Sequence, residues 1–248
     1  MKKAVLAAAV FFAGAAGVFA APAFSAGAGG VLGGHFTRYR LEADGAVRIA
    51  ADQNINQFDA GGFVFFDATF ATLAVTFSAG SSSFDEPVSI DGTPVDAMSR
   101  TGHGWDAMLG FSLLGRFPFR LSERFTVFPL LGMDYQISLM QRRRQDGHGY
   151  VYDRTNPPEG IIDHPDLEGG TFNLSDWNAF FVRIGGGAEF DLTDRLFLRG
   201  DLLYGIRLMT GYERRSLELM QYLAGDPSPS LGGLSSGPSL RLGVGWRF

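Results

Sequence analysis

The side chains that most often carry out chemistry are few in this sequence and widely spaced. Four histidines occur, at His35, His103, His148 and His164. Two of them stand in the stretches "DGHGY" and "HPDLE", close to acids such as Asp146 and Asp163. Neither stretch has the fixed ligand spacing of a zinc site, and loops rich in Asp, Gly and Pro carry such residues for turns. We therefore predict no metal site and no cofactor.

A nucleophile–base pair is the second chemistry to consider. Ser78 or Ser112 would become a nucleophile if a histidine such as His35 accepted its proton. Nothing in the order or spacing of these residues brings a serine and the histidine together. Polar residues in the interior of a fold are the commoner reading. We predict that the chain is not an enzyme.

Charged residues at alternate positions of otherwise apolar segments are more informative. They are five acids and six arginines: Asp67, Asp106, Asp134, Glu189 and Asp201, with Arg116, Arg183, Arg199, Arg207, Arg241 and Arg247. A solvated strand face usually carries Lys and Glu, but the only lysines are Lys2 and Lys3. Arginine with short acids and glycine suits a cramped interior where charges pair closely. We predict that these side chains form a charge network in the lumen of a barrel.

The segments that must position these charges alternate with a period of two, which is typical of strands. The chain has 34 glycines and 23 phenylalanines in 248 residues, a composition that suits packed strands better than helices. Eight candidate strands result: 31–39, 62–68, 72–78, 105–116, 125–139, 180–190, 198–208 and 239–248. A β-sandwich or a soluble calyx also alternates, with its apolar face inside. The charged face favours the inverted arrangement, with the apolar face outside.

The predicted connections alternate between short and long. Short turns fall near 67–70, 119–124 and 191–195. The long stretches fall near 40–60, 80–103, 141–177 and 211–236. Outer-membrane barrels show this asymmetry, with short periplasmic turns and long extracellular loops. We predict an all-β fold, an eight-stranded antiparallel up-and-down transmembrane β-barrel.

The two ends and the overall charge restrict the compartment and the partners. Met1-Lys2-Lys3 is basic, the run 4–21 is uncharged and apolar, and small residues follow. This order predicts a signal peptide over 1–25, cleaved after Ala20 or after Ser25, and a barrel domain over 26–248. There is no cysteine, so no disulfide framework exists. The net charge of -5 provides no basic field for nucleic acid, which we exclude as a partner.

The closing stretch "SLRLGVGWRF" resembles the β-signal of bacterial outer-membrane proteins. The apolar residues at every second position, ending in phenylalanine, are Leu240, Leu242, Val244, Trp246 and Phe248. The resemblance implies that the barrel-assembly machinery recognises this strand and that the protein lies in the outer membrane. The whole predicted barrel looks like a small barrel of the OmpA/OmpX/OmpW kind. Unlike the full OmpA type, this sequence ends at the barrel.

An eight-stranded barrel is just wide enough for its side chains to fill it, so paired charges would plug the lumen. We expect a monomer, surrounded by outer-membrane lipid, with a structural or surface-interaction role through its long loops. The stretch 141–177 starts with Arg142-Arg143-Arg144 and then becomes acidic, and we expect an extracellular ligand there. A narrow, porin-like channel for small solutes is the alternative, and a lipid-modifying enzyme is the second alternative.

Overall fold

Eight long strands make up most of the described chain. The computed structural model describes residues 24–96, 99–145, 151–153, 178–208, 211–225 and 228–248. The long strands are β1 (Phe24–Asp44), β2 (Arg48–Ala68), β3 (Ala71–Glu86), β6 (Arg100–Arg116), β8 (Phe125–Gln145), β10 (Ala179–Asp191), β11 (Leu196–Arg207) and β12 (Ser230–Arg247). The smaller elements are β4 (Val88–Ile90), β5 (Thr93–Pro94), β7 (Phe119–Arg120), β9 (Val151–Asp153) and the helix α2 (Gly211–Ala224). Each long strand overlaps one of the eight predicted segments.

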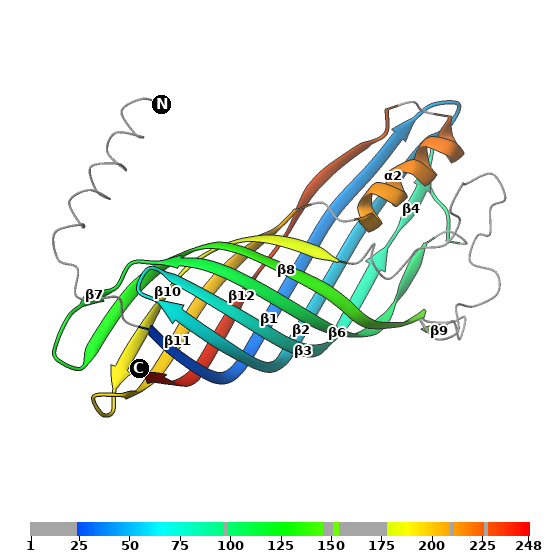
Figure 1. The fold of residues 1–248 in the computed structure, drawn as a ribbon. Helices are drawn as coiled ribbons and strands as arrows, with labels where there is room; N and C mark the ends of the chain where they lie inside the picture. The colour runs from blue at the N-terminus through cyan, green and yellow to red at the C-terminus, as the bar shows by residue number, and fades with distance from the viewer. Residues whose placement is uncertain (1–23, 97–98, 146–150, 154–177, 209–210, 226–227) are drawn as a thin grey trace, which may run out of the picture.

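The eight long strands form one closed ring. Their order is β1–β12–β11–β10–β8–β6–β3–β2, and β2 returns to pair with β1 (Figure 1). All of these pairs are antiparallel, and the first and last strands close the ring from Ser25 opposite Arg247 to Glu42 opposite Ser230. Every long strand therefore has a partner on both sides, which removes the open edges of a sheet. The prediction of an eight-stranded antiparallel up-and-down barrel is confirmed.

The outer face of the ring carries a continuous set of exposed apolar side chains. This apolar band includes Phe24, Leu32, Phe36, Phe58, Val64, Phe66, Leu73, Phe77, Trp105, Phe111, Leu113, Leu131, Met133, Tyr135, Phe180, Ile184, Leu198, Leu202, Leu240, Leu242, Val244 and Trp246. The residues between them along each strand point into the ring, where charged side chains are buried. Exposed apolar area of this extent would drive association in water, whereas lipid accepts it. The fold is that of a transmembrane barrel, apolar outside and polar inside.

The prediction of a loop near 40–60 was wrong, because β1 and β2 continue through this stretch as a paired hairpin. Apolar and polar residues still alternate here, but the apolar residues now face inward and the charged residues face outward. Leu41 and Ala43 point inward and are buried, whereas Arg40 and Asp44 lie on the outer face and are exposed. With charged residues on its outer face, this stretch lacks the outward apolar row of a lipid-facing strand.

The three other predicted long connections also contain regular structure. In 80–103, β3 runs to Glu86, β6 starts at Arg100, and β4 pairs with the tip of β2. In 211–236, the chain forms α2 and then β12 from its start at Ser230. In 141–177, β8 continues to Gln145 and pairs with β9. The remainder of that stretch, 146–150 and 154–177, lies outside the described residues, and so do His148, His164, Asp146 and Asp163.

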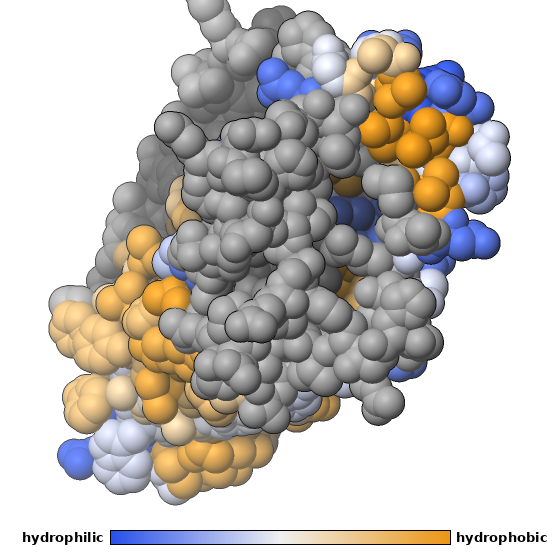
Figure 2. Space-filling view, turned by 90° about the vertical axis from the view of Figure 1, so that its right-hand side faces the viewer, coloured by the Kyte–Doolittle hydropathy of each residue, from blue (hydrophilic) through white to orange (hydrophobic). Residues whose placement is uncertain are grey.

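The helix α2 packs against the inward side of the β1–β2 hairpin. Ala224 of α2 is buried in one cluster with Leu41, Ala43, Ile49 and Ala51. We call residues 38–54, β4 and α2 together the extension, and Figure 1 shows it projecting beyond the shorter strands β10 and β11. At the top of Figure 2, where Figure 1 places the hairpin and α2, hydrophilic and hydrophobic surface are mixed, while hydrophobic surface dominates the barrel wall below. The extension is thus organised around an apolar core of its own.

The predicted signal peptide, residues 1–25, lies outside the described residues up to position 23. Phe24 and Ser25 already belong to β1, and the carbonyl oxygen of Phe24 accepts a hydrogen bond of 3.1 Å from the backbone N–H of Phe248. Of the two predicted cleavage sites, the one after Ala20 leaves β1 whole, and the one after Ser25 removes its first two residues. No helix among the described residues is long and apolar enough to cross a membrane.

Candidate functional site: the charged lumen

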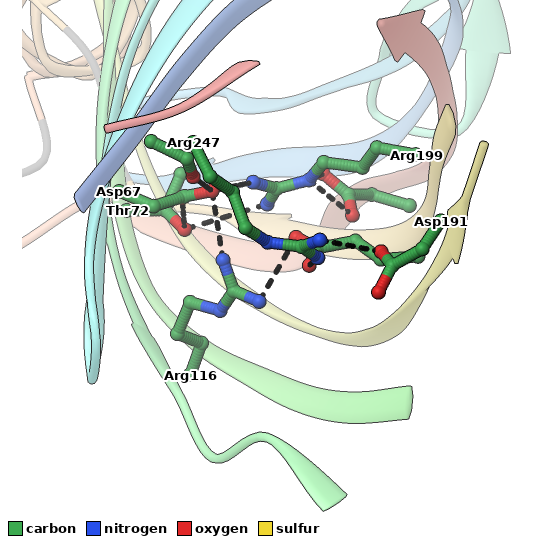
Figure 3. A network of polar contacts seen from close by, with 9 residues as sticks. Asp67, Thr72, Arg116, Asp191, Arg199 and Arg247 are labelled. Atoms are coloured by element: carbon green, nitrogen blue, oxygen red, sulfur yellow. Dashed lines mark hydrogen bonds and ion pairs between the residues drawn. The ribbon is translucent and has the colours of Figure 1, made fainter. Parts of the chain in front are cut away.

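The interior of the barrel near its short turns is organised around Asp67. This carboxylate is buried on β2 and forms ion pairs with Arg116 of β6 and Arg199 of β11, each at 2.7 Å (Figure 3). The hydroxyl of Thr72 donates a further hydrogen bond to it at 2.6 Å. The two arginines approach from opposite sides of β2, because β6 lies beyond β3 in the ring and β11 lies beyond β1 and β12. One carboxylate therefore ties three strands together across the lumen.

Each of these arginines also pairs with a second acid. Arg199 lies 2.9 Å from Asp201, and Arg116 lies 2.9 Å from Glu189. Arg247 of β12 continues the chain of contacts, because it pairs with Glu189 at 3.0 Å and with Asp191 at 2.5 Å (Figure 3). We call the connected set the plug: Asp67, Arg116, Glu189, Asp191, Arg199, Asp201 and Arg247. Paired partners of this kind compensate the desolvation of buried charges.

Phenylalanine rings fill the space that the charges leave. The guanidinium carbon of Arg116 lies 4.2 Å from the centre of the Phe128 ring, and that of Arg247 lies 4.5 Å from the Phe197 ring. Arg199 stacks in the same way on Phe65, at 4.7 Å. A guanidinium over an aromatic face gains a cation–π attraction that is stronger when both groups are desolvated. The plug is therefore filled by stacked rings as well as by ion pairs.

Glycine makes room for these rings. A Cβ atom at Gly245 would lie 2.2 Å from a ring carbon of Phe197, and one at Gly187 would lie 2.3 Å from a ring carbon of Phe128. Distances this short are excluded by van der Waals repulsion, so the rings occupy the space that a side chain would need at these two positions. The glycines on the charged rows therefore serve the filling of the lumen.

A second cluster lies further toward the extension, around Asp134 of β8. Arg183 of β10 pairs with this carboxylate at 2.7 Å, and the hydroxyl of Ser112 donates to it at 3.2 Å. Arg241 of β12 in turn donates to the oxygen of Ser112 at 2.9 Å. Asp106 is also buried, on β6 nearer the extension. Predicted lumen residues from six strands thus meet at two successive levels.

The last predicted lumen residue, Arg207, connects the barrel to the extension. It pairs with Glu213 of α2, whose carboxylate is 1% exposed, and its guanidinium lies 5.9 Å from the Tyr39 ring. Burial raises the pKa of Tyr39, with Glu213 raising it further and the neighbouring Arg207 lowering it. The first turn of α2 is therefore held over the lumen by an acid that reaches down to an arginine of the barrel wall.

The structure does not assemble a nucleophile–base pair from the predicted residues. Within the part of the chain that the structure describes, no hydrogen bond joins His35 to Ser78 or Ser112. The His35 ring lies 4.8 Å from the Phe181 ring, and Ser112 is engaged with Asp134 and Arg241. His103 is exposed on the outer face of β6. Among the described residues, no group of three or more His, Cys, Asp or Glu side chains could hold a metal ion.

Sequence reasoning missed several residues of the lumen. The predicted charge network does not include Phe65, Phe128 and Phe197, although they share the period-two rows of Asp67, Asp134 and Arg199. These shared rows are the signal that places the three rings in the lumen, because alternate residues of a strand lie on one face. Glu213 was missed since it lies on a helix, where a strand rhythm provides no information.

The ring, the apolar band and the charged interior define the class of protein: an eight-stranded transmembrane β-barrel. No family model matches the sequence, and no curated protein matches it. Among solved structures, the chain is similar to the attachment invasion locus protein Ail of Yersinia pestis, with 12% identity, 90% of this chain and 98% of that chain covered, and a TM-score of 0.35.

Two further solved structures are similar to this chain. For the N-terminal β-barrel domain of Pseudomonas aeruginosa OprF, the identity is 12%, the coverage is 90% of this chain and 99% of that one, and the TM-score is 0.34. For the outer membrane protease OmpT of Escherichia coli, the identity is 8%, the coverage is 93% of this chain and 99% of that one, and the TM-score is 0.42. Likenesses this loose assign no role to this chain.

Proposed function

We propose that this chain is an outer-membrane barrel with a closed lumen, which anchors a structured extension at the cell surface for a structural or surface-interaction role. The observation that carries the proposal is the plug, in which charges from β2, β6, β10, β11 and β12 meet across the interior. A barrel of eight strands has little space left once such side chains and their stacked rings are in place.

Several features support the outer membrane as the location. The apolar band surrounds the ring, and the last strand exposes Leu240, Leu242, Val244, Trp246 and Phe248 on the outer face. We propose that the barrel-assembly machinery recognises this row and that the leader directs export. Because β1 and β12 close the ring within one chain, the barrel needs no second copy, and we propose a monomer.

The helix α2 supports a second level of closure. Glu213 reaches down to Arg207, and the apolar side of the helix covers the inward face of the β1–β2 hairpin. A solute moving through the lumen would have to displace both the helix and the plug. A narrow porin-like channel would require both the helix and the plug to move aside. We therefore propose that the native barrel does not conduct.

Single-channel recording in a planar bilayer tests the closed lumen. The wild-type chain is expected to give no stable conductance. The double variant Arg116→Ala/Phe128→Ala removes a stacked pair from the plug and is expected to give conductance steps or flickering. The matched control Phe119→Ala/Arg120→Ala removes the same residue types from β7, where both are exposed, and is expected to stay silent. Reproducible steps from the wild-type chain would establish the channel instead.

We propose that the chain has no enzymatic activity on lipid. The His35 ring packs against the Phe181 ring, and Ser112 belongs to the Asp134 cluster. Incubation of the refolded chain with lipid A or with phospholipid, beside a His35→Ala variant, is expected to yield no product from either protein. Product from the wild-type chain alone would identify a lipid-modifying enzyme.

The surface role is proposed for the extension together with the stretch 141–177. The wild-type chain, a variant lacking 146–150 and 154–177, and a variant lacking α2 would be compared for binding to cell-surface and matrix ligands. Loss of binding in either deletion supports the role and assigns it to one segment. Unchanged binding in both deletions would remove the extension and this stretch from consideration.

A further inference from the structure

A polar groove lies on the outer face of the barrel wall, just beyond the apolar band. It crosses four neighbouring strands, β1, β2, β3 and β6, and has an open volume of about 370 Å³. Its walls carry hydrogen-bonding side chains: Arg38, Asn54, Asn56, Ser83, Asp85 and His103. Small side chains at the centre and longer ones at the sides produce the hollow.

The strand register arranges these residues in two rows. One row reads Arg38, Asn54, Asp85 and Thr101 from β1 to β6. Residues directly opposite in antiparallel strands share a face and lie close together, so this row is a continuous polar surface. In the next row, Asn56 and Ser83 stand between Phe36 and His103. The groove is therefore built by the sheet itself and does not depend on a loop.

Arg38 is held in place by the wall of the groove. Its Nη1 atom donates to the carbonyl oxygens of Thr37 at 2.7 Å and Ile55 at 3.3 Å, and its Nη2 atom donates to Asn56 at 2.6 Å. A guanidinium has five N–H donors in a rigid fork, so two donors are left for a ligand. An arginine that is already ordered loses little conformational freedom when it binds a planar or tetrahedral anion.

The opposite side of the groove offers acceptors. Asp85 lies two strands away from Arg38 in the same row, roughly 10 Å across at the usual strand spacing. An exposed carboxylate and neighbouring amide and hydroxyl side chains accept and donate hydrogen bonds to sugar hydroxyls, whereas a bare phosphate would be repelled by the carboxylate. The chemistry of the groove thus fits a ligand with an anionic group at one end and hydroxyls at the other.

The position of the groove indicates where such a ligand comes from. The next row toward the middle of the band contains Phe58, Ser81 and Trp105, and both aromatic side chains are exposed. Aromatic side chains of this kind mark the boundary between acyl chains and headgroups. A lipid whose chains lie against the apolar band would place its headgroup in the groove.

We propose that this groove binds the phosphorylated sugar headgroup of an outer-leaflet glycolipid, with Arg38 contacting the phosphate and Asn54, Asn56 and Asp85 contacting the sugar. The inference rests on the proposed function, because it requires the barrel to be in a membrane. It adds a specific lipid site to that function. The groove would fix the height of the barrel, and thereby of the extension, relative to the membrane surface.

The test uses the full chain refolded into neutral phosphatidylcholine vesicles that contain lipid A, phosphatidylglycerol or neither. After extraction into mild detergent, native mass spectrometry counts the lipid that stays bound. The wild-type chain is expected to retain lipid A in preference to phosphatidylglycerol. Arg38→Gln is expected to reduce lipid A retention roughly tenfold, as for one charge-assisted hydrogen-bonded contact. Asn56→Ala, which frees Arg38, is expected to reduce it less.

Arg40→Gln is the matched control, since Arg40 lies two residues along the same outer face, pairs with Glu42 and does not line the groove. It is expected to retain lipid A as the wild-type chain does. Equal retention by Arg38→Gln would overturn the site, and equal retention of phosphatidylglycerol would overturn sugar recognition. Equally tight binding of the free, deacylated headgroup would overturn the lipid as the source. Failure of the wild-type chain to float with vesicles would instead overturn the proposed function.

Discussion

Strands β1 and β2 run through two regions of opposite polarity. Within the apolar band, Phe36 and Leu32 face outward while charged and polar residues of the ring are buried. A few residues further along β1, Arg40 faces outward and Leu41 is buried with α2. The sense of the alternation reverses within one continuous strand, which shows that the surrounding medium, lipid or water, decides which row is apolar.

The two interiors are stabilised in different ways. The barrel interior holds the plug, where each buried charge has a partner and the rings of Phe65, Phe128 and Phe197 fill the gaps. The extension has an aliphatic core around Leu41 and Ile49, with the pair of Arg207 and Glu213 below it. The first region depends on pairing of charges and the second on burial of apolar area. Removing a buried charge should therefore destabilise the barrel interior, and removing apolar volume should destabilise the extension.

Removing the central charge of the plug is expected to have the largest effect. Asp67→Asn leaves Arg116 and Arg199 with one acid fewer in a closed interior, and breaking a buried pair costs about 3–5 kcal/mol. Urea unfolding in lipid vesicles measures this change. The matched variant Asp52→Asn acts on an exposed acid of the extension that lies 3.8 Å from Arg40, and no resolvable change is expected. Equal effects would contradict the contrast between the two interiors.

The core of the extension is expected to respond to the loss of apolar volume. Leu41→Ala removes a side chain that is 1% exposed, and such truncations cost about 2–5 kcal/mol through lost burial and a cavity. Hydrogen exchange of α2 should rise, because the helix packs on this core. Leu32→Ala acts on the same strand where the side chain is 59% exposed to the lipid side, and a smaller loss is expected since lipid fills the space. A larger loss at Leu32 would refute this picture.

A charge placed on the outer face distinguishes the two media. Val64→Arg on β2 introduces a cation into the apolar band, where the cost is about 2–4 kcal/mol near the midplane. Ala50→Arg places the same side chain on the outer row of the same strand in the extension, where water surrounds it and almost no cost is expected. Folding yield into vesicles and the urea midpoint report the difference. If Ala50→Arg were as damaging as Val64→Arg, the outer face of the extension would not be in water.

The smallest effect is expected from the titration of Tyr39. Burial raises its folded-state pKa above the unfolded value of about 10, although Arg207 opposes the shift. Its contribution to stability is present below the unfolded pKa and is lost as the pH rises through the folded pKa. The urea midpoint of the wild-type chain should therefore fall more steeply than that of Tyr39→Phe as the pH rises above about 10. Parallel pH profiles of the two proteins would show that Tyr39 does not contribute.

Much of the fold was accessible to sequence reasoning because period-two alternation is a local property. All eight long strands overlap predicted segments, and the row containing Asp67 and the row of Arg199 were assigned inward from charge alone. The boundaries near 40–60 were wrong, since Arg40 and Leu41 follow the same alternation with its sense reversed. The helix α2 was not predicted because a strand-based analysis treated 211–236 as a connection.

The sequence by itself therefore determined the number of strands, their approximate places and the set of charges on one face, all of which depend on neighbours along the chain. Only the tertiary structure decided which charges meet, because Asp67 and Arg199 are brought together by closure of the ring across 132 residues. It also decided that the rings of Phe128 and Phe197 fill the lumen, since Arg116 and Arg247, which stack on them, come from different strands. The reversal of polarity in the extension depends on the height of each residue relative to the lipid, and a one-dimensional pattern does not contain that height.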